Sequence, residues 1–421
     1  MRPVIVIGGG PAGLMAADVV SAAGLAVTVY ERMPSVGRKL LLAGRGGLNL
    51  THSEPIEPFL GRYGAARASL EGPIRAYPPD ALRAFAEALG EPTFVGSSGR
   101  VFPRAMKASP LLRAWLARLA RQGVVIRTRR RLIGLDGPGR VMLADPDGAI
   151  EVAEAAAVVL ALGGGSWPRL GSDGSWVDLV RGLGVAVRPL TSANVGAEIA
   201  WSEHFRTHFQ GQPLKRIAVS AGRDWVRGEA VVTAGGLEGG VIYALTPQLR
   251  DEIQSRGRAR ITIDLRPDLD TASLAAKLAG ARGKQSLSSW LRKAARLSPA
   301  AIGLLREGLI AAMPSEPGQL AQAIKATAVE VTALAGLARA ISSAGGVALD
   351  QVREDMMLEA APGVFVAGEM LDWEAPTGGY LLQGCFATGY AAGCGVLGYL
   401  GCKPVCSAAN GYRSVPVSTL D

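Results

Sequence analysis

The feature that most constrains this chain is a glycine-rich loop of the form GxGxxG at residues 8–13. An apolar run rich in β-branched residues precedes it at 3–7, and a pattern typical of a helix covers 11–23. A second strand is predicted at 26–30. Strand, loop, helix and strand in this order predict a βαβ unit of the Rossmann type, which binds dinucleotides.

Each residue of this loop has a physical task in such a unit. Gly8 permits the tight turn, Gly10 lets a diphosphate approach the backbone, and Gly13 lets the helix lie close to the strand. The start of the helix offers free N–H groups to the anion. Glu31, at the end of the second strand, is expected to accept hydrogen bonds from the adenosine ribose hydroxyls, which disfavours the 2′-phosphate of NADP at this site.

A second motif near the other end of the chain favours FAD over NAD. An apolar strand is predicted at 364–367, ending in Gly368 and Glu369. The turn 377–380 follows and leads into a helix of small residues. We expect the Glu369 carboxylate to bind the ribityl chain and the helix start to direct its N–H groups at the flavin pyrimidine ring.

The composition of the chain changes near residue 187. Short strand-like segments follow at 195–264, and 271–313 is mostly helical in pattern. Strand and turn signals return after Gly346. This order predicts an insertion between two halves of one nucleotide-binding domain. Residues 38–53 are glycine-rich and are expected to form an irregular loop that faces the cofactor.

Charge is unevenly distributed along the chain. The formal net charge is 45 − 36 = +9, and residues 201–345 contain 19 Lys and Arg against 12 Asp and Glu, so that +7 lies in this segment. Two interpretations remain open: a solvated, arginine-rich surface, or a patch for an acidic partner such as RNA.

The remaining composition favours a cytoplasmic protein without metal or membrane segment. The four cysteines lie within the last 40 residues without a CxxC pair, which predicts reduced thiols. No signal peptide is recognised, and the apolar run 384–400 is expected to be a buried helix. His204 and His208 have no acid in register, so no metal site is predicted.

Several segments resemble the BaiN/RdsA-like family of NAD(P)/FAD-dependent oxidoreductases. The resemblance is carried by the glycine loop with Glu31, and by segments 37–52, 99–109, 161–174, 344–352 and 366–389. It implies an α/β fold in which a Rossmann-like FAD-binding domain is split by a β-barrel-like insertion that carries a helical subdomain. The expected boundaries are 1–187 and 346–400 for the FAD-binding domain, 188–267 and 326–345 for the β-rich insertion, 268–325 for the helical subdomain, and 401–421 for a tail.

One segment departs from the family pattern. Family members often carry Gly-Asn-Gly-Arg-Cys-Asn where this chain has Gly44-Arg-Gly-Gly-Leu-Asn49, so no role of that thiol or arginine can be transferred. Arg45, Asn49 and Thr51 are candidates for flavin or substrate contacts, with a role in stabilising the loop as the alternative. Further candidates for catalysis are Arg100, Lys107 and Tyr380.

The expected cofactor contacts come from both ends of the chain. Arg38 and Lys39 are expected either to neutralise the diphosphate or to lie on the surface. The full expected set is Gly8, Gly10, Pro11, Ala12, Gly13, Glu31, Arg32, Arg38, Lys39, Gly44, Leu132, Gly163, Gly368, Glu369, Gly379, Tyr380 and Leu381.

The resemblance implies that the chain reduces or dehydrogenates a carbon–carbon double bond, in either a small molecule or an RNA base. A flavin would transfer hydride at its N5 atom. The sequence has no second GxGxxG loop between a strand and a helix, so NAD(P)H could dock only transiently as the electron donor. The alternative function is a flavin-bound protein that modifies rRNA to dihydrouridine or assists ribosome assembly through the basic insertion.

Overall fold

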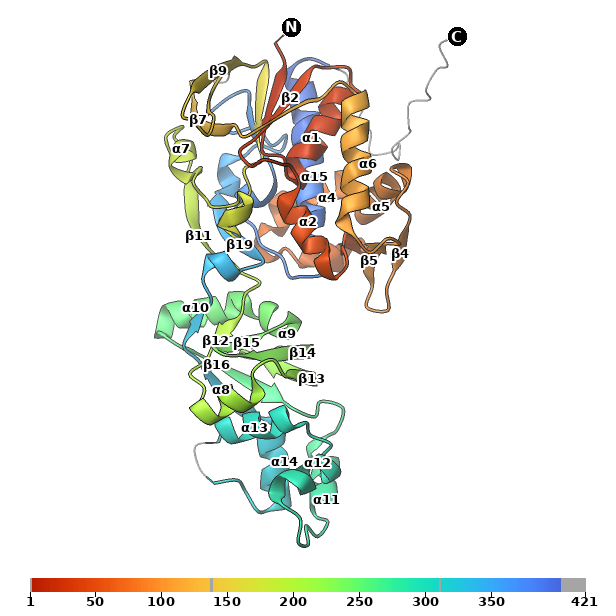
Figure 1. Cartoon of the computed structure of the whole chain (residues 1–421), viewed down its shortest axis with the longest axis vertical. Helices are drawn as coiled ribbons and strands as arrows, with labels where there is room; N and C mark the ends of the chain where they lie inside the picture. Colours follow the sequence, from red (N-terminus) through yellow and green to blue (C-terminus); the bar gives the residue numbers. More distant parts are fainter. Residues whose placement is uncertain (1, 137–138, 310–311, 403–421) are drawn as a thin grey trace. The chain divides into compact units, whose positions relative to one another are not determined.

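The computed structural model describes residues 2–136, 139–309 and 312–402. The chain divides into two compact units (Figure 1). The first unit comprises Met1–Thr191 and Ser342–Asp421, and the inserted unit comprises Ser192–Ile341. The finer boundaries expected from the sequence stay predictions, and the expected tail lies outside the described residues after Cys402.

The first unit is built on a five-stranded parallel sheet in the order β20-β10-β1-β2-β6. β1 pairs with β10 on one side and with β2 on the other, so Val6 lies opposite both Val159 and Val29. Every residue of β1 and β10 is buried, as expected of parallel strands covered on both faces. The strands are β1 (Val4–Ile7), β2 (Val27–Glu31), β6 (Val125–Thr128), β10 (Ala157–Leu160) and β20 (Val364–Val366).

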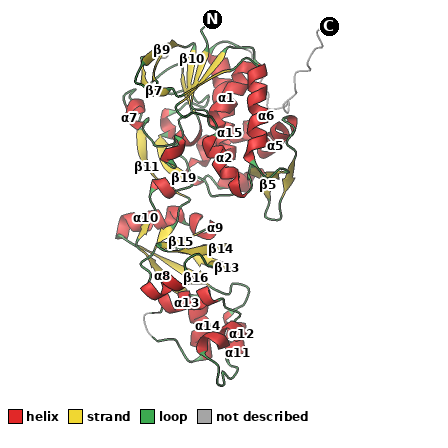
Figure 2. Cartoon of the chain, in the orientation of Figure 1, coloured by secondary structure: helices red, strands yellow, loops and turns green. Residues whose placement is uncertain are grey.

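Three helices, α1 (Pro11–Ala22), α6 (Ala108–Arg121) and α15 (Tyr380–Tyr399), lie on one side of this sheet (Figure 2). α1 and α15 approach closely because α15 presents glycines to α1. A Cβ atom on Gly389 would lie 2.3 Å from the Ala12 carbonyl oxygen, and one on Gly393 would lie 2.7 Å from Val19 Cβ. The small residues near the C-terminal end therefore bring the two ends of the chain together, and the helices predicted at 11–23 and 384–400 are confirmed.

The segment 38–53 is more regular than predicted. It forms the helix α2 (Arg38–Ala43), a 3-10 turn at Gly44–Gly46 and the strand β3 (Thr51–His52). The expectation of an irregular loop is wrong because its glycines occupy only the turns, while Arg38–Ala43 contains good helix formers. The other elements of the first unit are α3 (Ile56–Gly61), α4 (Arg67–Ala76), α5 (Pro79–Ala88), α7 (Val177–Arg181), β4 (Thr93–Val95), β5 (Arg100–Pro103), β7 (Arg131–Leu135), β8 (Arg140–Ala144), β9 (Ile150–Glu154), β11 (Val187–Ala193) and β19 (Ser342–Val347).

The inserted unit contains a seven-stranded sheet in the order β17-β16-β13-β14-β15-β12-β18. β17 and β18 stand at opposite ends of this order, yet only Thr332 separates them in the chain. The sheet therefore curves until one extended run joins its two ends, in agreement with the barrel-like insertion that the resemblance implies. The strands are β12 (Ala197–Glu198), β13 (Pro213–Ser220), β14 (Trp225–Thr233), β15 (Gly236–Glu238), β16 (Ala259–Asp264), β17 (Thr327–Val331) and β18 (Ala333–Leu334).

Helices of the inserted unit pack against this sheet around a hydrophobic core of their own. The helices predicted within 271–313 are confirmed. Helices α8, α9 and α10 were not predicted, since they lie where the sequence predicts only strand-like segments. α14 lies within the predicted helical subdomain 268–325. It begins at Pro317, where proline occupies the first turn and the Glu316 carboxylate accepts hydrogen bonds from two backbone N–H groups. The helices are α8 (Glu203–Phe209), α9 (Gly240–Tyr243), α10 (Thr246–Arg256), α11 (Thr271–Leu278), α12 (Leu287–Ala294), α13 (Pro299–Glu307) and α14 (Pro317–Lys325).

Cysteines and apolar helices complete the description. Cys385 and Cys402 are free thiols, in agreement with the expectation of reduced thiols at these two positions, and Cys406 lies outside the described residues. Within the described ranges, no helix combines the length and apolar character needed to cross a membrane. The same ranges contain no group of three or more His, Cys, Asp or Glu residues placed to hold a metal ion.

Candidate functional site

A cavity in the first unit opens at the carboxyl ends of β1, β2, β10 and β20, which is where parallel α/β sheets bind ligands. Its empty volume, including the part open to solvent, is about 1090 Å³. Segments from both ends of the chain form its walls. The lining includes Gly8, Gly9, Gly10, Pro11, Ala12, Glu31, Arg32, Arg38, Lys39, Arg130, Arg131, Leu132, Gly163, Ser172, Asp173, Trp176, Gly368, Glu369 and Cys385.

The three glycines of the loop are required for different reasons. Gly8 has φ +108°, and a Cβ atom there would lie 2.2 Å from the Ala161 carbonyl oxygen. A Cβ atom on Gly13 would lie 2.0 Å from the Gly8 carbonyl oxygen. At Gly10, by contrast, an added Cβ atom meets no protein atom within 4 Å. Packing therefore explains Gly8 and Gly13, whereas Gly10 leaves room for a ligand that approaches the backbone.

The start of α1 presents unsatisfied N–H groups to this space. Gly10 is the N-cap residue and Pro11 opens the helix, and no side chain caps it. The uncapped N–H groups and the positive end of the helix dipole suit an anion such as a diphosphate.

Glu31 closes one end of the cavity with a fixed carboxylate. Its two oxygens accept hydrogen bonds from the backbone N–H groups of Gly9 and Met33, each at 2.8 Å. Burial raises the pKa of Glu31, and these two hydrogen bonds offset part of that effect. The carboxylate is thus held where β2 ends, with its remaining acceptor capacity available to a ligand.

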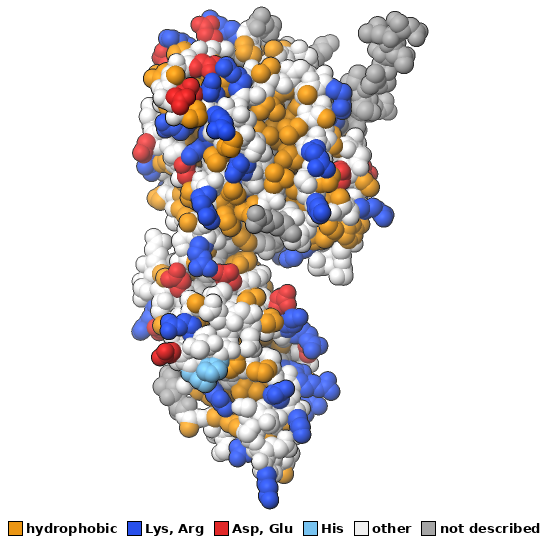
Figure 3. Space-filling view, viewed as in Figure 1, with side chains coloured by type: hydrophobic (Ala, Val, Ile, Leu, Met, Phe, Trp, Pro, Cys, Tyr) orange, Lys and Arg blue, Asp and Glu red, His pale blue; other side chains and the backbone are white. Residues whose placement is uncertain are grey.

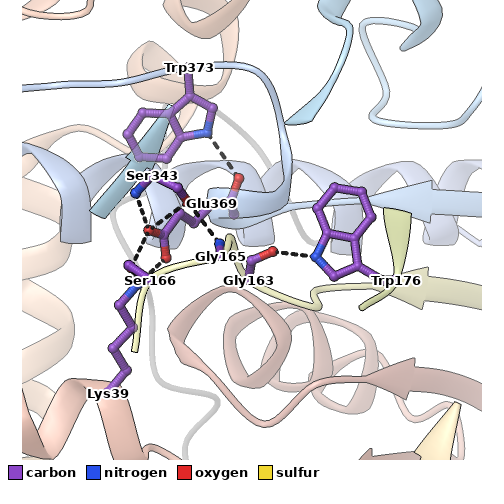
Figure 4. Close-up of polar contacts among 9 residues, drawn as sticks. Lys39, Gly163, Gly165, Ser166, Trp176, Ser343, Glu369 and Trp373 are labelled. Atoms are coloured by element: carbon purple, nitrogen blue, oxygen red, sulfur yellow. Dashed lines mark hydrogen bonds and ion pairs between the residues drawn. The ribbon is translucent and has the colours of Figure 1, made fainter. Parts of the chain in front are cut away.

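A polar cluster around Glu369 forms another wall of the cavity (Figure 4). Lys39 Nζ lies 2.5 Å from Glu369 Oε2 and 2.6 Å from Ser166 Oγ. The backbone N–H of Ser343 donates to Glu369 Oε1 at 3.0 Å, and Ser343 Oγ in turn accepts from the Gly165 N–H at 3.0 Å. Four segments that are distant in the sequence thus meet at one carboxylate.

Two indoles hold the glycine turns of this wall in place (Figure 4). Trp176 Nε1 donates to the Gly163 carbonyl oxygen, and Trp373 Nε1 donates to that of Gly368, both at 2.9 Å. Gly368 has φ +82°, and a Cβ atom there would lie 2.8 Å from Ala12 Cβ. The turn after β20 is therefore fixed directly against the start of α1.

Four buried polar atoms in this region have no protein partner. Arg38 Nε and Ser172 Oγ belong to residues that line the cavity, and Asn49 Oδ1 and Thr51 Oγ1 belong to the segment after α2. A buried polar atom without a hydrogen bond costs about 1–3 kcal/mol. Their presence indicates that a polar ligand completes these contacts, so the donor and acceptor set fits a dinucleotide cofactor.

Tyr380 belongs to a separate cluster beside the turn before α15. Its hydroxyl donates to Glu54 Oε1 at 2.5 Å, and Arg62 binds both oxygens of the same carboxylate at 3.1 and 2.8 Å. The His52 ring stacks on the Tyr380 ring with centroids 5.5 Å apart. Burial raises the pKa of Tyr380 far above its usual value, and the bond to Glu54 adds to this effect, so the phenol stays protonated.

The structure places twelve of the expected cofactor contacts on the cavity wall: Gly8, Gly10, Pro11, Ala12, Glu31, Arg32, Arg38, Lys39, Leu132, Gly163, Gly368 and Glu369. Gly13 and Gly44 pack against backbone instead, and Gly379, Tyr380 and Leu381 lie at the start of α15 outside this lining. Their roles as cofactor contacts stay predictions.

Three of the catalytic candidates lie away from the cavity. Arg100 and Lys107 are exposed, on β5 and immediately before α6, and Asn49 is partly buried. Asn49, Arg100 and Lys107 do not line the cavity described above. Arg45 belongs to the turn Gly44–Gly46, and the roles of all four residues stay predictions.

Sequence reasoning missed Asp173 on the cavity wall, and Ser166 and Ser343 in the cluster around Glu369. Ser166 and Asp173 lie within 161–174, a segment that carries the family resemblance, which was a usable signal. Ser343 had no such signal, since it reaches Glu369 only through tertiary folding, and folding also forms the ion pair of Asp173 with Arg32 at 2.7 Å. Cys385 also lines the cavity, and burial raises the pKa of its thiol to about 12, so the thiol stays neutral.

This fold and site define the class: the protein is a flavoprotein oxidoreductase with a Rossmann-type FAD-binding unit. More particularly, the chain belongs to the family of HI0933-like proteins, whose Rossmann domain matches residues 2–395. The family resemblance seen in the sequence is thereby confirmed.

The chain is also similar to individual proteins of known activity. It is 27% identical over 411 residues to a 3-dehydro-bile acid delta(4,6)-reductase of Clostridium scindens, covering 93% of this chain and 98% of the reductase. Among solved structures, it resembles the 3-ketosteroid delta1-dehydrogenase of Sterolibacterium denitrificans with a TM-score of 0.51 and 13% identity, covering 93% of this chain and 98% of that one. A 3-ketosteroid-delta4-(5alpha)-dehydrogenase of Rhodococcus jostii gives a TM-score of 0.48 at 16% identity, covering 94% and 99%. The likeness to the Sterolibacterium denitrificans enzyme shows the fold.

Proposed function

We propose that this protein is an FAD-dependent oxidoreductase that reduces the carbon–carbon double bond of a steroid-like enone, or forms such a double bond by dehydrogenation. The cavity of the first unit carries the cofactor part of the proposal. It joins two carboxylates, Glu31 and Glu369, which are held by backbone N–H groups at the ends of β2 and after β20.

The residues present suit FAD along its length. Glu31 would bind the adenosine ribose, and the free N–H groups at the start of α1, beside Gly10, would bind the diphosphate. Arg38 would add a positive charge there, and its Nε, which has no protein partner, would be available to a ligand. Glu369 would bind the ribityl chain, with Lys39 holding its carboxylate in place.

Bound FAD would supply a hydride acceptor and donor at N5 of its ring. The chain's own contribution would be to orient the ring and exclude water. Thr51 and Gly379 pack against each other at the start of α15: a Cβ atom on Gly379 would lie 2.5 Å from Thr51 Cα. Thr51 Oγ1, buried and without a partner, would then be free to bond a polar edge of the cofactor.

The substrate class rests on the similarity to the bile acid reductase, which spans nearly the full length of both chains. A steroid-like enone would accept hydride at the double bond conjugated to its carbonyl. NAD(P)H is proposed as the donor, docking transiently. No relative named above points to RNA, and we do not propose the RNA alternative.

The cofactor is tested by an absorbance spectrum of the purified protein, followed by denaturation and chromatography of the released flavin. The activity is tested by anaerobic addition of NADPH or NADH, followed by a 3-dehydro-bile acid or a Δ4-3-ketosteroid. The proposal expects released FAD, bleaching by a pyridine nucleotide, and recovery of the flavin absorbance on addition of the steroid. Reduced flavin that no steroid reoxidises would refute the substrate class. Protein that neither contains nor takes up FAD would refute the whole proposal.

A further inference from the structure

The strand β13 of the inserted unit contains a β-bulge that includes Arg216. The pairing of β13 with β14 shifts register between Leu214 and Ile217, so that Lys215 and Arg216 form a bulge. β13 also pairs with β16, with Ala218 opposite Asp264. Arg216 comes two residues before this pair on β13, and Arg266 comes two residues after the end of β16.

A third arginine meets the same point from the end of α12. The Arg266 guanidinium donates from Nη1 to the carbonyl oxygens of Ala295 and Arg296, the latter at 3.3 Å. Burial lowers the pKa of Arg266, and the positive charges of Arg216 and Arg296 lower it further, while the carboxylates of Asp268 and Asp264 oppose this effect. Arg266 thus contacts the backbone of Arg296 directly and interacts electrostatically with both other arginines.

The acids near these arginines are engaged elsewhere. Asp264 Oδ2 binds Lys325 Nζ at 2.7 Å, and Asp268 Oδ1 binds Arg227 Nη1 at 3.2 Å. Within 2–136, 139–309 and 312–402, Arg216 and Arg296 form no ion pair. Figure 3 shows Lys and Arg side chains gathered along the flank where Figure 1 labels β13 and β14. The cluster thus keeps a surplus of positive charge.

The backbone of both exposed arginines is strained. Arg216 has φ +52° and Arg296 has φ +51°, in the left-handed region where residues other than glycine are disfavoured. Glycine would satisfy the turn at either position with less strain. Fold stability therefore does not explain two arginines here, and strain in a non-glycine residue is often associated with a functional site.

We propose that Arg216, Arg266 and Arg296 form a binding site for the phosphate group of a small soluble molecule. Guanidinium groups present paired N–H donors that match the oxygens of a phosphate, and the Arg266 guanidinium is already fixed by two carbonyl oxygens. The site lies in the inserted unit and is independent of the proposed redox function.

The test compares three FAD-loaded proteins in titration calorimetry with inorganic pyrophosphate at constant ionic strength. The first is the unaltered chain, and the second carries Arg216→Gly with Arg296→Gly, which keeps the left-handed turns. The third carries Arg256→Ala with Lys277→Ala, which removes the same charge at exposed positions outside the cluster. We expect the affinity for pyrophosphate to fall about 10-fold or more in the glycine variant, which corresponds to about 1.4 kcal/mol. In the control variant, the affinity is expected to stay within about 2-fold of that of the unaltered chain.

The thermal midpoint of the glycine variant is expected to equal or exceed that of the unaltered chain, because strain is relieved. A parallel titration with NADPH and NADH distinguishes a nucleotide phosphate from free phosphate. Tighter binding of the nucleotides or of pyrophosphate supports the site. Equal weakening in the control variant would show a general charge effect and overturn the proposal. The proposal would also be overturned if pyrophosphate did not bind, or if a short RNA bound and pyrophosphate did not.

Discussion

Lys39 and Glu369 stand 330 positions apart in the chain and form an ion pair of 2.5 Å between Nζ and Oε2. This contact ties α2, beside the N-terminal glycine loop, to the turn after β20. It closes the cofactor cavity from segments that lie at opposite ends of the sequence. Both side chains are largely shielded from water, with 28% and 11% of their surface exposed.

Replacing Lys39 by Met is expected to destabilise the cofactor-free protein by about 1–3 kcal/mol, because Glu369 would keep a mostly buried charge without its cation. Urea unfolding of the apoprotein measures this change. The double variant Lys39→Met with Glu369→Gln removes both charges and should recover part of the loss. A double variant no more stable than Lys39→Met would show that the pair is not coupled.

Replacing Gly10 and Gly13 by Ala should separate ligand binding from folding. Gly10→Ala is expected to leave the melting temperature of the apoprotein nearly unchanged but to weaken FAD binding about 10-fold or more, because the new methyl group enters the space left for the ligand. Gly13→Ala is expected to destabilise the apoprotein by about 2 kcal/mol or more, since its Cβ atom would meet the Gly8 carbonyl oxygen at 2.0 Å. FAD titration followed by flavin fluorescence, with apoprotein melting, measures both. Normal FAD affinity in Gly10→Ala would argue against the diphosphate position.

Glu54 makes stability depend on pH at acidic values. Burial by itself would raise the pKa of Glu54, but hydrogen bonds from Arg62 and Tyr380 outweigh it and lower the pKa. A carboxyl whose pKa is lower in the folded state stabilises the protein above its unfolded value, about 4.3, and this contribution is lost as pH falls through the folded pKa. Glu54→Gln should therefore be less stable than the unaltered chain at neutral pH, and the difference should shrink below about pH 4. A difference that stays constant between pH 7 and pH 3 would contradict this role.

Asp18 anchors α1 to α6 with a fully buried carboxylate. It accepts hydrogen bonds from Trp115 Nε1 at 2.8 Å, Arg118 Nε at 3.1 Å and Gln122 Nε2 at 3.2 Å. Asp18→Ala is expected to lower the free energy of unfolding by about 3 kcal/mol, because it leaves three donors, one of them charged, without this acceptor. Denaturant unfolding measures the loss. FAD affinity should change by no more than about 2-fold, because Asp18 does not line the cavity. A change of this size is well below a tenfold change, which corresponds to about 1.4 kcal/mol. A large loss of affinity without loss of stability would contradict a structural role.

The sequence alone determined the parts of this protein whose signal is local. A βαβ unit, the tight glycine turn, the acid at the end of β2 and the second motif before α15 each follow from residue type and spacing over short stretches. The same signals indicated FAD and an inserted segment. Helices α8, α9 and α10 were missed because their segments were interpreted as strand-like, and the regular structure of 38–53 was missed because glycine marks turns between regular elements as well as irregular loops.

Only the tertiary structure decided which distant residues share the cavity. Ser343 has no motif of its own. It reaches Glu369, as Asp173 reaches Arg32, because β10 lies between β1 and β20 and brings both ends of the chain into one parallel sheet. Tertiary contact also distinguished Gly13, which packing requires, from Gly10, which faces open space. Such differences depend on what surrounds each atom, and spacing along the chain carries no information about those surroundings.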